Sequence, residues 1–406
     1  MSGRYTPVPP QVDLPAMERA VLALWRENDT FARSLEQTEG GDPWTFYEGP
    51  PTANGMPGVH HVEARVFKDV FPRFQTMRGY HVVRKAGWDC HGLPVEIAVE
   101  KELGFTGKAD IEAFGVAEFN ARCRESVLRH VGEFEAMTER MGYWVDMSDP
   151  YRTMDPEYVQ SVWWSLKRTF DKGLLVEDYR VAPYCPRCET TLSDHELGQP
   201  GGYETVVDPS VYVRFPLTSG PYADGPNRAA LLVWTTTPWT LVANTAVAVR
   251  PDVTYVAARN DETGEVLVVA EALVGAALGE GWTVVDSFAG SSMERWTYQR
   301  PFELVEWPEG AEGHLVVLAD YVTTEDGTGL VHQAPAFGAE DMGVARAYGL
   351  PVVRPVQPDG HFAPDVALVG GEFFKHADKA LVRDLESRGL LLRHLAYEHT
   401  YPHCWR

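Results

Sequence analysis

Two short segments rich in glycine, proline and polar residues hold the residue types that could bind a phosphate-bearing ligand. The first, EGPPTANG at residues 48–55, is followed by Gly58, His60 and His61. If a helix begins there, its free N–H groups and partial positive charge suit a phosphate chain, and the imidazoles could add hydrogen bonds. Taken alone, the segment also fits a surface loop with incidental histidines, because it is neither a Walker A loop nor a GxGxxG turn. The second segment is GWDCHGLP at residues 87–94.

The flanking sequence predicts the elements that would position these segments. Residues 44–47 and 81–85 are predicted strands, one before each segment, and a helix over residues 62–77 with a kink at Pro72 lies between them. Strand, glycine-rich loop, helix and strand form the start of a parallel α/β sheet, in which ligands bind beyond the carboxyl ends of the strands. Both segments are therefore expected at one edge of the sheet.

Helical patterns lie on both sides of this unit. Asp13 begins a helix whose apolar residues are spaced three and four apart, and this helix is expected to pack on the main body. Residues 120–175 are largely helical in pattern. The apolar positions of the first helix are Leu14, Met17, Val21 and Leu24. Those of the helix over residues 62–77 are Val62, Val66, Val70, Phe74 and Met77. The expected core residues within 120–175 are Trp144, Trp163, Trp164 and Leu166.

A shift in composition near residues 198–202 marks the start of a different region. The β-rich runs that then dominate are residues 211–215, 230–234, 266–270 and 315–318. They predict a mostly β domain over residues 201–395, inserted after the first α/β half. The other predicted parts are a helical extension at residues 1–42, the α/β half at 43–200 and a return segment at 396–406.

The predicted β domain contains an unusual run of hydroxyl groups. WTTTPWT at residues 234–240 places three threonines in succession, and such hydroxyls are hard to satisfy in a core. GTGLVH at residues 327–332 and Asp341 follow farther along the chain. An ordinary strand is the alternative for the threonine run.

Cysteine spacing indicates a possible metal site. The chain has five cysteines, an odd number that is too small for a disulfide framework, and only Cys185 and Cys188 form a CxxC. Tetrahedral zinc needs four ligands. Cys404 is the one distant cysteine placed to contribute, and His403 could substitute as a ligand. A reduced thiol pair without metal is the alternative.

Composition excludes several classes of protein. The hydrophobic share of 44% is ordinary for a globular chain, and no run approaches the roughly 18 apolar residues of a membrane span. Lys and Arg total 36 against 58 Asp and Glu, a net charge of −22. A protein that grips phosphates over its whole surface should be basic, so contact with nucleic acid must be local or made by parts not present. A cytoplasmic monomer with no membrane partner is expected.

Several long motifs occur in an order that resembles the class I aminoacyl-tRNA synthetases and, among them, the isoleucyl-tRNA synthetase family. These motifs, spread over essentially the whole chain, are GPPTANG (49–55), GWDCHGLPVE (87–96), WWSL (163–166), YCPRC (184–188), WTTTPWT (234–240) and GTGLVHQAPAFGAED (327–341). The resemblance implies the first half of a Rossmann-type catalytic domain with an inserted editing domain. It also implies ATP-dependent activation of isoleucine with Mg²⁺, transfer to tRNA(Ile), hydrolysis of mischarged valyl-tRNA(Ile), and Zn²⁺ held by Cys185, Cys188 and Cys404 in the intact protein.

The resemblance assigns roles to the two segments described first. The substrate-binding residues that it implies are Glu48, Gly49, Pro50 and Asp89, with Gly49 and Pro50 lining the amino-acid pocket and Asp89 holding the substrate ammonium. A carboxylate facing that cation makes electrostatic sense.

The ATP-binding motif departs from the family pattern. The family has His-x-Gly-His, whereas residues 58–61 are Gly-Val-His-His, so Gly58 and His60 exchange places while His61 matches the last histidine. The usual glycine leaves room for the adenine, and the side chain of His60 should crowd that position unless it stacks on the base or the loop shifts. A compensated rearrangement is favoured over an inactivated site. It resembles a branch of isoleucyl enzymes that tolerate mupirocin, which implies the same tolerance here.

In the inserted domain, the resemblance implies an editing site. Trp234 and the threonines Thr235, Thr236 and Thr237 would shape the pocket and position water, His332 would contact the ester end, and Asp341 would bind the ammonium of the misattached amino acid. Isoleucine and valine differ by one methylene, worth only ~1–3 kcal/mol of discrimination, so a second and smaller pocket supplies the remaining accuracy.

Class I enzymes also need a Lys-Met-Ser-Lys-Ser-type loop, and no segment of the sequence matches it. We therefore expect an N-terminal portion of an isoleucyl enzyme that does not charge tRNA alone but could still hydrolyse mischarged tRNA. A free-standing trans-editing hydrolase and a non-catalytic binding module are the alternatives.

Overall fold

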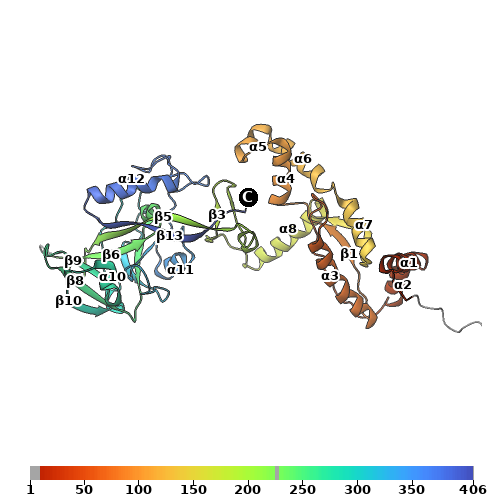
Figure 1. Cartoon of the computed structure of the whole chain (residues 1–406), viewed down its shortest axis with the longest axis horizontal. Helices are drawn as coiled ribbons and strands as arrows, with labels where there is room; N and C mark the ends of the chain where they lie inside the picture. The colour runs from red at the N-terminus through yellow and green to blue at the C-terminus, as the bar shows by residue number, and fades with distance from the viewer. Residues whose placement is uncertain (1–9, 225–227, 406) are drawn as a thin grey trace, which may run out of the picture. The chain divides into compact units, whose positions relative to one another are not determined.

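The computed structural model describes residues 10–224 and 228–405 and divides the chain into two compact units, Met1–Glu177 and Asp178–Arg406 (Figure 1). The parts of the predicted segments 1–42, 201–395 and 396–406 that fall on residues 1–9, 225–227 and 406 lie outside the described residues. The first unit is mostly helical and the second mostly β, so the chain has an α/β fold. No helix in the described ranges combines the length and apolarity needed to cross a bilayer.

The first unit is built from helices around a short parallel strand pair. Its elements are α1 (Leu14–Glu27), α2 (Thr30–Gln37), α3 (Val59–Met77), β1 (Lys85–Trp88), α4 (Leu93–Leu103), α5 (Lys108–Phe114), α6 (Val116–Val127), α7 (Val131–Met141), β2 (Asp146–Arg152) and α8 (Pro156–Asp171). β1 and β2 pair in parallel, with Lys85 opposite Asp146 and Trp88 opposite Arg152. The segments between and after these strands therefore begin at one edge of the pair.

Two of the predicted strands differ from the structure. The strand expected over residues 44–47 is wrong: Pro43 and His81 form only an isolated parallel bridge, in which Trp44 N donates to His81 O at 3.0 Å. The second strand begins at Lys85, at the end of the predicted range 81–85. β2 lies inside the region predicted as helical, because its polar sequence DMSDPYR has no apolar alternation and pairing with β1 decides its conformation.

The apolar helix faces also differ from expectation. Trp163, Trp164 and Leu166 of α8 are 68%, 67% and 42% exposed, so they are not core residues of the described part of the chain. α8 has no buried residue in that part. On α3 the predicted positions Val66, Val70, Phe74 and Met77 are likewise exposed, whereas Val62 is half-buried. The buried residues of this helix are Arg65 and Pro72.

α1 does not pack through its predicted stripe. Leu14, Met17, Val21 and Leu24 are all exposed. Trp25 instead forms an edge-to-face contact with Trp144, with ring centroids 5.1 Å apart. Two ion pairs, Glu18–Arg140 at 2.7 Å and Arg26–Glu139 at 3.0 Å, add exposed contacts to α7. Such surface pairs contribute little, so aromatic packing fixes this helix.

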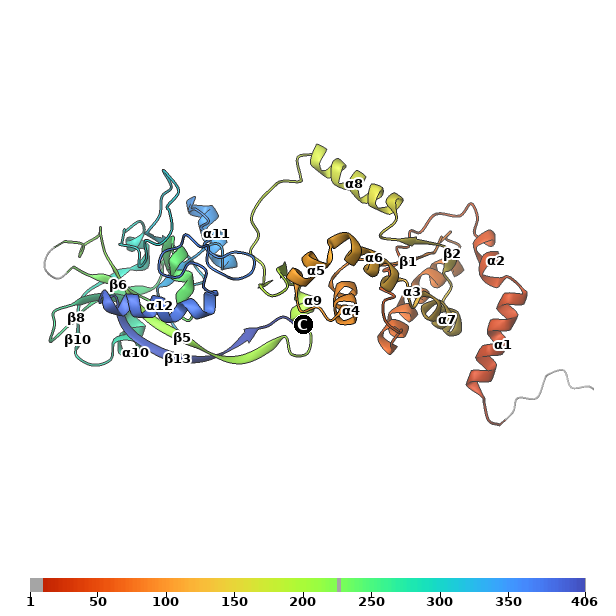
Figure 2. The same ribbon diagram turned by 90° about the horizontal axis from the view of Figure 1, so that it is seen from above.

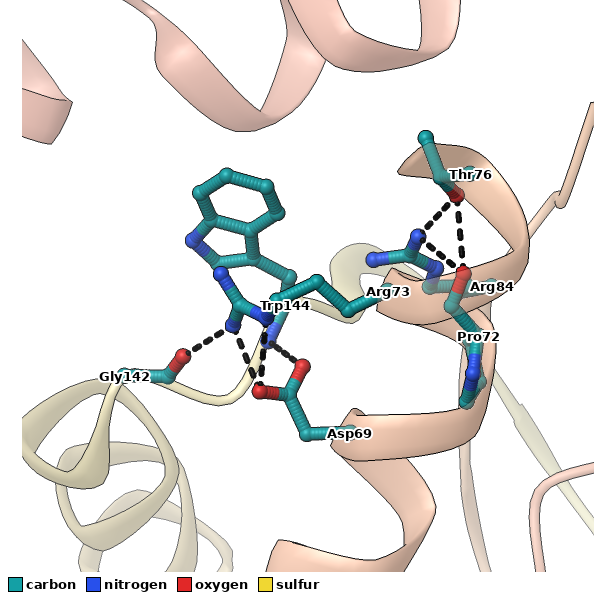
Figure 3. Close-up of polar contacts among 7 residues, drawn as sticks. All are labelled: Asp69, Pro72, Arg73, Thr76, Arg84, Gly142 and Trp144. Atoms are coloured by element: carbon teal, nitrogen blue, oxygen red, sulfur yellow. Dashed lines mark hydrogen bonds and ion pairs between the residues drawn. The ribbon is translucent and has the colours of Figure 1, made fainter. Parts of the chain in front are cut away.

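The middle of α3 is held by two arginines (Figure 3). The guanidinium of Arg73 pairs with Asp69 at 2.6 Å, donates to Gly142 O at 2.8 Å and lies 3.8 Å from the ring centroid of Trp144. Arg84 donates to Pro72 O at 3.0 Å and to Thr76 Oγ1, although it is fully buried. These contacts fix α3, the helix that begins at the segment containing His60 and His61.

The second unit contains a six-stranded sheet in the order β10-β8-β9-β6-β5-β13 and a three-stranded sheet in the order β11-β7-β12. Its elements are β3 (Tyr184–Cys185), β4 (Thr190–Thr191), α9 (Asp194–Leu197), β5 (Tyr203–Pro216), β6 (Ala230–Thr235), η1 (Pro238–Ala243), β7 (Ala246–Val249), β8 (Thr254–Asn260), β9 (Val266–Ala270), η2 (Glu271–Leu273), α10 (Val274–Leu278), β10 (Trp282–Ala289), η3 (Gly290–Met293), β11 (Leu315–Leu318), β12 (Val331–Gln333), α11 (Ala339–Tyr348), α12 (Phe374–Ser387) and β13 (Leu391–Pro402).

The strand predictions for this unit are confirmed. β9 and β11 have the predicted bounds, and the other two predicted runs lie within β5 and β6. β5 and β13 form a long antiparallel ribbon that extends from Leu391 opposite Val213 to Pro402 opposite Tyr203 (Figure 2). The ribbon ends beside the CxxC hairpin of β3 and β4, where His403 N donates to Gly202 O at 2.8 Å.

Candidate functional site

α3 begins at the histidine segment, as predicted. Gly58 is its N-cap residue, and Gly58 N donates to Nδ1 of His61 at 2.9 Å. This hydrogen bond requires a lone pair on Nδ1, which places the proton of the neutral ring on Nε2. The ring of His61 also meets Phe134 edge-to-face at 4.9 Å. Burial, followed by the charges of His60, Arg65 and Lys68, lowers the pKa of His61, so this imidazole is neutral at pH 7.

The exchange of Gly58 and His60 has a simple packing explanation. The rings of His60 and His61 lie 3.9 Å apart. A Cβ atom on Gly58 would lie 2.9 Å from Cε1 and 3.0 Å from Nδ1 of His60. The His60 imidazole thus occupies the space beside residue 58 that a side chain there would need. A histidine at position 60 therefore goes together with a glycine at position 58.

Alanine at position 58 should therefore be destabilising. We expect Gly58→Ala to lower the free energy of unfolding of the first unit by about 1 kcal/mol, because alanine is a poorer N-cap residue than glycine and the exposed ring of His60 must also move. Gly55→Ala is the matched control, since a Cβ at Gly55 meets no atom within 4 Å, and it should change the value by less than about 0.5 kcal/mol. Urea unfolding followed by tryptophan fluorescence measures both, and equal values for the two variants would contradict the packing explanation.

The structure brings the two predicted segments together. Asp89 N donates to Pro51 O at 2.9 Å, which joins the end of β1 to the first loop. Ala53 is fully buried in a cluster with Trp88 and Phe134, and Phe134 also contacts His61. The half-buried carboxylate of Asp89 accepts only long hydrogen bonds, from His91 N at 3.3 Å and Thr153 Oγ1 at 3.4 Å. Its remaining acceptor capacity is open to a cationic ligand.

The carboxylate of Glu48 is buried among protein side chains and does not face a ligand site. Its side chain is 4% exposed and accepts from Lys68 Nζ at 2.7 Å and from the Tyr143 hydroxyl at 2.5 Å. Its carbonyl accepts from the Tyr151 hydroxyl at 2.8 Å, and the ring of Tyr151 lies so close over Gly87 that a Cβ there would overlap it. Glu48 therefore anchors the loop that contains Gly49 and Pro50, and its carboxylate is engaged by protein partners.

In the second unit, three threonines and a histidine form one hydrogen-bonded chain. Thr235 Oγ1 lies 3.2 Å from Thr237 Oγ1, which lies 3.2 Å from Thr240 Oγ1, and Thr240 Oγ1 lies 2.9 Å from Nε2 of His332. Thr240 donates its proton to Thr237 O at 2.7 Å, so the assigned donor in the last bond is the Nε2–H of His332. Burial lowers the pKa of His332 to about 4, which keeps this ring neutral at pH 7.

Asp341 lies at the end of the strand that carries His332. It occupies the first turn of α11, and its Oδ2 accepts from Ala334 N at 2.8 Å, two residues beyond His332. The Tyr321 hydroxyl lies 3.5 Å from Oδ1. Burial raises the pKa of Asp341. The structure therefore groups Asp341 and His332 around one strand end.

A pocket of about 680 Å³ opens beside the threonine chain. Thr237 and Thr240 line it, whereas His332 and Asp341 are not among its lining residues. The other side chains that decide its character are the aromatic residues Trp239, Phe337, Phe374, Tyr184 and Tyr401 and the cations Arg180 and Arg354. The pocket thus combines hydroxyl groups, aromatic surfaces and positive charge.

The structure adds one residue to the predicted set and separates another from it. Thr240 stands in the motif WTTTPWT, and its spacing of three from Thr237 brings the two hydroxyls together at the start of η1. Trp234 points to the other face of the sheet, because side chains alternate along β6. There it donates to Ser210 Oγ at 2.6 Å and contacts Tyr397. Thr236 is half-buried between these two positions.

The three predicted metal-ligand cysteines converge. The Sγ atoms of Cys185, Cys188 and Cys404 all lie within 4.8 Å of one another, the one such group of His, Cys, Asp or Glu among the residues the structure describes. Cys188 N donates to the sulfur of Cys185 at 3.4 Å. Zn–S bonds of about 2.3 Å place tetrahedral sulfur atoms roughly 4 Å apart, so the thiols fit three corners of a zinc site. Nδ1 of His403 lies 3.0 Å from Tyr401 O.

Comparisons with known proteins agree with the sequence resemblance. Residues 20–224 match the family described as tRNA synthetases class I (I, L, M and V). The chain is 73% identical over 404 residues to an isoleucine–tRNA ligase of Streptomyces coelicolor, covering 99% of this chain and 38% of that protein. It is 51% identical over 395 residues to an isoleucine–tRNA ligase of Thermus thermophilus, covering 97% of this chain and 37% of that protein.

A solved ternary complex of a LeuRS of Agrobacterium radiobacter with tRNA and LeuAMS is similar with a TM-score of 0.34 and 17% identity, covering 97% of this chain and 49% of that chain. The chain spans about 38% of the length of the first curated relatives that it matches.

Proposed function

The chain belongs to the class I tRNA synthetase family, and from this membership we propose that it carries the isoleucine- and ATP-binding segments of an isoleucine–tRNA ligase together with its editing domain. The proposed reactions are activation of isoleucine by ATP with Mg²⁺, ligation to tRNA(Ile), and hydrolysis of mischarged valyl-tRNA(Ile). Residues 43–200 would form the first half of the catalytic domain and residues 201–395 the editing domain. We propose a cytoplasmic monomer, with ligation requiring further parts of a longer protein.

For activation, the residues of the first unit have distinct proposed roles. The carboxylate of Asp89 binds the isoleucine ammonium, and the loop that contains Gly49 and Pro50 lines the amino-acid pocket. The N-terminus of α3 faces the ATP phosphates, where the Nε2–H of neutral His61 donates to charge that develops as pyrophosphate leaves. The ring of His60 packs against that of His61, tilted by 41° with the centroids 3.9 Å apart, and buttresses it. Glu48 acts through the loop that it anchors and does not contact the substrate.

For editing, the proposed substrate enters the pocket with its ester beside Thr237 and Thr240. Threonine hydroxyls orient a water molecule toward the ester carbonyl, and Asp341 attracts the ammonium of the amino acid. His332 is neutral and donates to Thr240, so it orients a hydroxyl rather than removing a proton. The observation that carries this proposal is the continuous chain of hydrogen bonds from Thr235 to His332, of which Thr237 and Thr240 line the pocket. Asp341 lies outside the lining, at the end of the strand that carries His332.

The proposal is tested by giving the chain valyl-tRNA(Ile) and isoleucyl-tRNA(Ile) without ATP. We expect hydrolysis of the valyl ester at a rate at least tenfold above that of the isoleucyl ester, because a pocket can exclude the larger side chain. Titration calorimetry with ATP and isoleucine examines the first unit separately. Absence of valyl ester hydrolysis would reject the editing assignment, and binding of neither ligand would reject the activation assignment.

We propose in addition that Cys185, Cys188 and Cys404 hold a zinc ion that fixes the hairpin of β3 and β4 to the segment after β13. Zinc stabilises deprotonated thiols, whereas burial and the neighbouring thiols raise the pKa of Cys188 to about 12 without a cation. The ion is structural and takes no part in either reaction.

Zinc content measures this assignment directly. We expect about one zinc per purified chain and a loss of at least 80% of it in Cys188→Ser, because two thiols do not retain the ion against a chelator. Cys123→Ser is the matched control, since Cys123 lies outside the cluster, and it should keep its zinc. Atomic emission after dialysis against a chelator gives both values, and equal zinc in the two variants would exclude the site.

A further inference from the structure

One buried carboxylate of the second unit is not used by any role described above. Asp378 lies on α12 and is 5% exposed. Its Oδ1 accepts from Trp239 N at 2.8 Å, across 139 residues of sequence. Trp239 is the second residue of η1, and the N–H groups in the first turn of a helix have no partners within the helix. Asp378 therefore caps η1 from another element and places a carboxyl group at the positive end of its dipole.

η1 connects directly to the threonine chain. It begins immediately after Thr237 and contains Thr240, the hydroxyl that links Thr237 to His332. The ring of Trp239 lies between Phe337 and Phe374, with centroids 4.7 and 4.6 Å away, and all three aromatic residues line the pocket. A shift in the first turn of η1 would move Thr240 and this aromatic wall together.

From these contacts we propose that Asp378 is a positioning residue of the editing site, which fixes the start of η1 and thereby the spacing of Thr237 and Thr240. This proposal rests on the proposed editing function. Asp378 does not contact the substrate; it acts through the backbone of Trp239. No motif in the sequence marks it, because the residue lies on a helix far along the chain from the threonines.

The protonation state of Asp378 depends on pH because of its burial and the charges around it. Lys375 on the same helix pairs at 2.6 Å with Asp208 of β5, and Asp208 also accepts from His399 of β13 at 3.1 Å. Burial raises the pKa of Asp378 to about 7, the Trp239 N–H and Lys375 oppose this rise, and Asp208 adds to it. Because charged acceptors form stronger hydrogen bonds, the cap is strongest above pH 7.

The stability of the folded protein changes with pH in the opposite direction to the strength of the hydrogen bond between Asp378 and Trp239 N. The folded pKa of Asp378 is above the ordinary value of 3.8, so the folded protein binds the proton more tightly than the unfolded chain does. The stability that this proton contributes is present below about pH 4 and is lost as the pH rises toward 7. Asp378→Asn cannot titrate, so the unfolding free energy of the wild type should fall relative to this variant across that interval.

The experiment compares Asp378→Leu, which removes the acceptor, with Asp378→Asn, which keeps a neutral acceptor. Asp365→Asn is the matched control on an exposed aspartate. We expect Asp378→Leu to lower kcat for valyl-tRNA(Ile) hydrolysis at least tenfold with KM within twofold, and Asp378→Asn to stay within about threefold at pH 6. The ratio of the wild-type rate to that of Asp378→Asn should rise between pH 6 and pH 8.

Hydrogen exchange of the Trp239 amide, followed by NMR, gives a readout that does not depend on activity. It should be at least tenfold faster in Asp378→Leu than in the wild type and unchanged in Asp365→Asn. Equal exchange of this amide in wild type and Asp378→Leu, or wild-type hydrolysis by Asp378→Leu, would overturn the proposal. If the wild type itself hydrolyses nothing, the editing function fails, and the amide exchange alone decides whether Asp378 holds η1.

Discussion

Asp341→Ala should reduce hydrolysis of valyl-tRNA(Ile) by at least about 100-fold. In the proposed editing site the part-buried carboxylate of Asp341 pairs with the substrate ammonium. Loss of such a charged partner costs about 3 kcal/mol, and each 1.36 kcal/mol corresponds to a factor of ten in rate. The carboxylate is suited to this pairing because, among the described residues, Ala334 N at 2.8 Å is its close donor and the Tyr321 hydroxyl lies 3.5 Å away. Deacylation of the valyl ester at pH 7.5 measures the loss.

Two further variants separate charge from structure at this position. Asp341→Asn keeps an acceptor for Ala334 N but has no charge, so it should lose nearly as much activity as the alanine variant while unfolding at a similar urea concentration. Glu340→Ala changes the adjacent exposed carboxylate of the same helix turn and should retain activity within twofold. Full activity in Asp341→Asn would show that the negative charge has no role, which would remove Asp341 from ammonium binding.

The parts of this molecule that sequence alone predicts are those whose information is local. β9 and β11 are continuous runs of apolar and β-branched residues, a composition that is typical of buried strands. α3 is likewise marked by Gly58 before it and by Gly79, with φ of 98°, after it. The expectation that the histidine segment and Asp89 come together is met by a different contact from the predicted one: no strand precedes the first segment, and the hydrogen bond from Asp89 N to Pro51 O joins it to the end of β1.

The missed features depend on contacts between distant residues. β2 is polar, and only its pairing with β1 makes it a strand. Asp378 contacts Trp239 across 139 residues of sequence, and no sequence pattern near either residue predicts the contact. Trp234 is adjacent to the threonines in sequence, but side chains alternate along β6, so Trp234 lies on the other face of the sheet. Trp163 has the composition of a core residue, yet its burial depends on partners outside its own helix.

Glu48→Ala should lower the free energy of unfolding of the first unit by about 2–3 kcal/mol. The substitution removes the carboxylate that accepts from Tyr143 and Lys68 and that faces the buried guanidinium of Arg65, although the Lys68 ammonium keeps its hydrogen bond to Gly49 O. A buried cation that loses its counter-charge is costly. Glu63→Ala removes an exposed carboxylate from the same helix as Lys68 and should change the value by less than about 0.5 kcal/mol. Urea unfolding measures both variants.

A further variant, Glu48→Gln, decides what Glu48 does for the substrate. If Glu48 only anchors the loop, Glu48→Gln, which keeps the shape and accepts from Tyr143, should recover at least half of the lost stability and bind isoleucine within about threefold of the wild type. A carboxylate that contacted the substrate ammonium directly would instead lose most of its binding on conversion to the amide, because a neutral oxygen pairs weakly with a cation. Isoleucine affinity that falls tenfold or more in Glu48→Gln, with stability preserved, would therefore move Glu48 from the anchor of the loop to the wall of the pocket, beside Asp89.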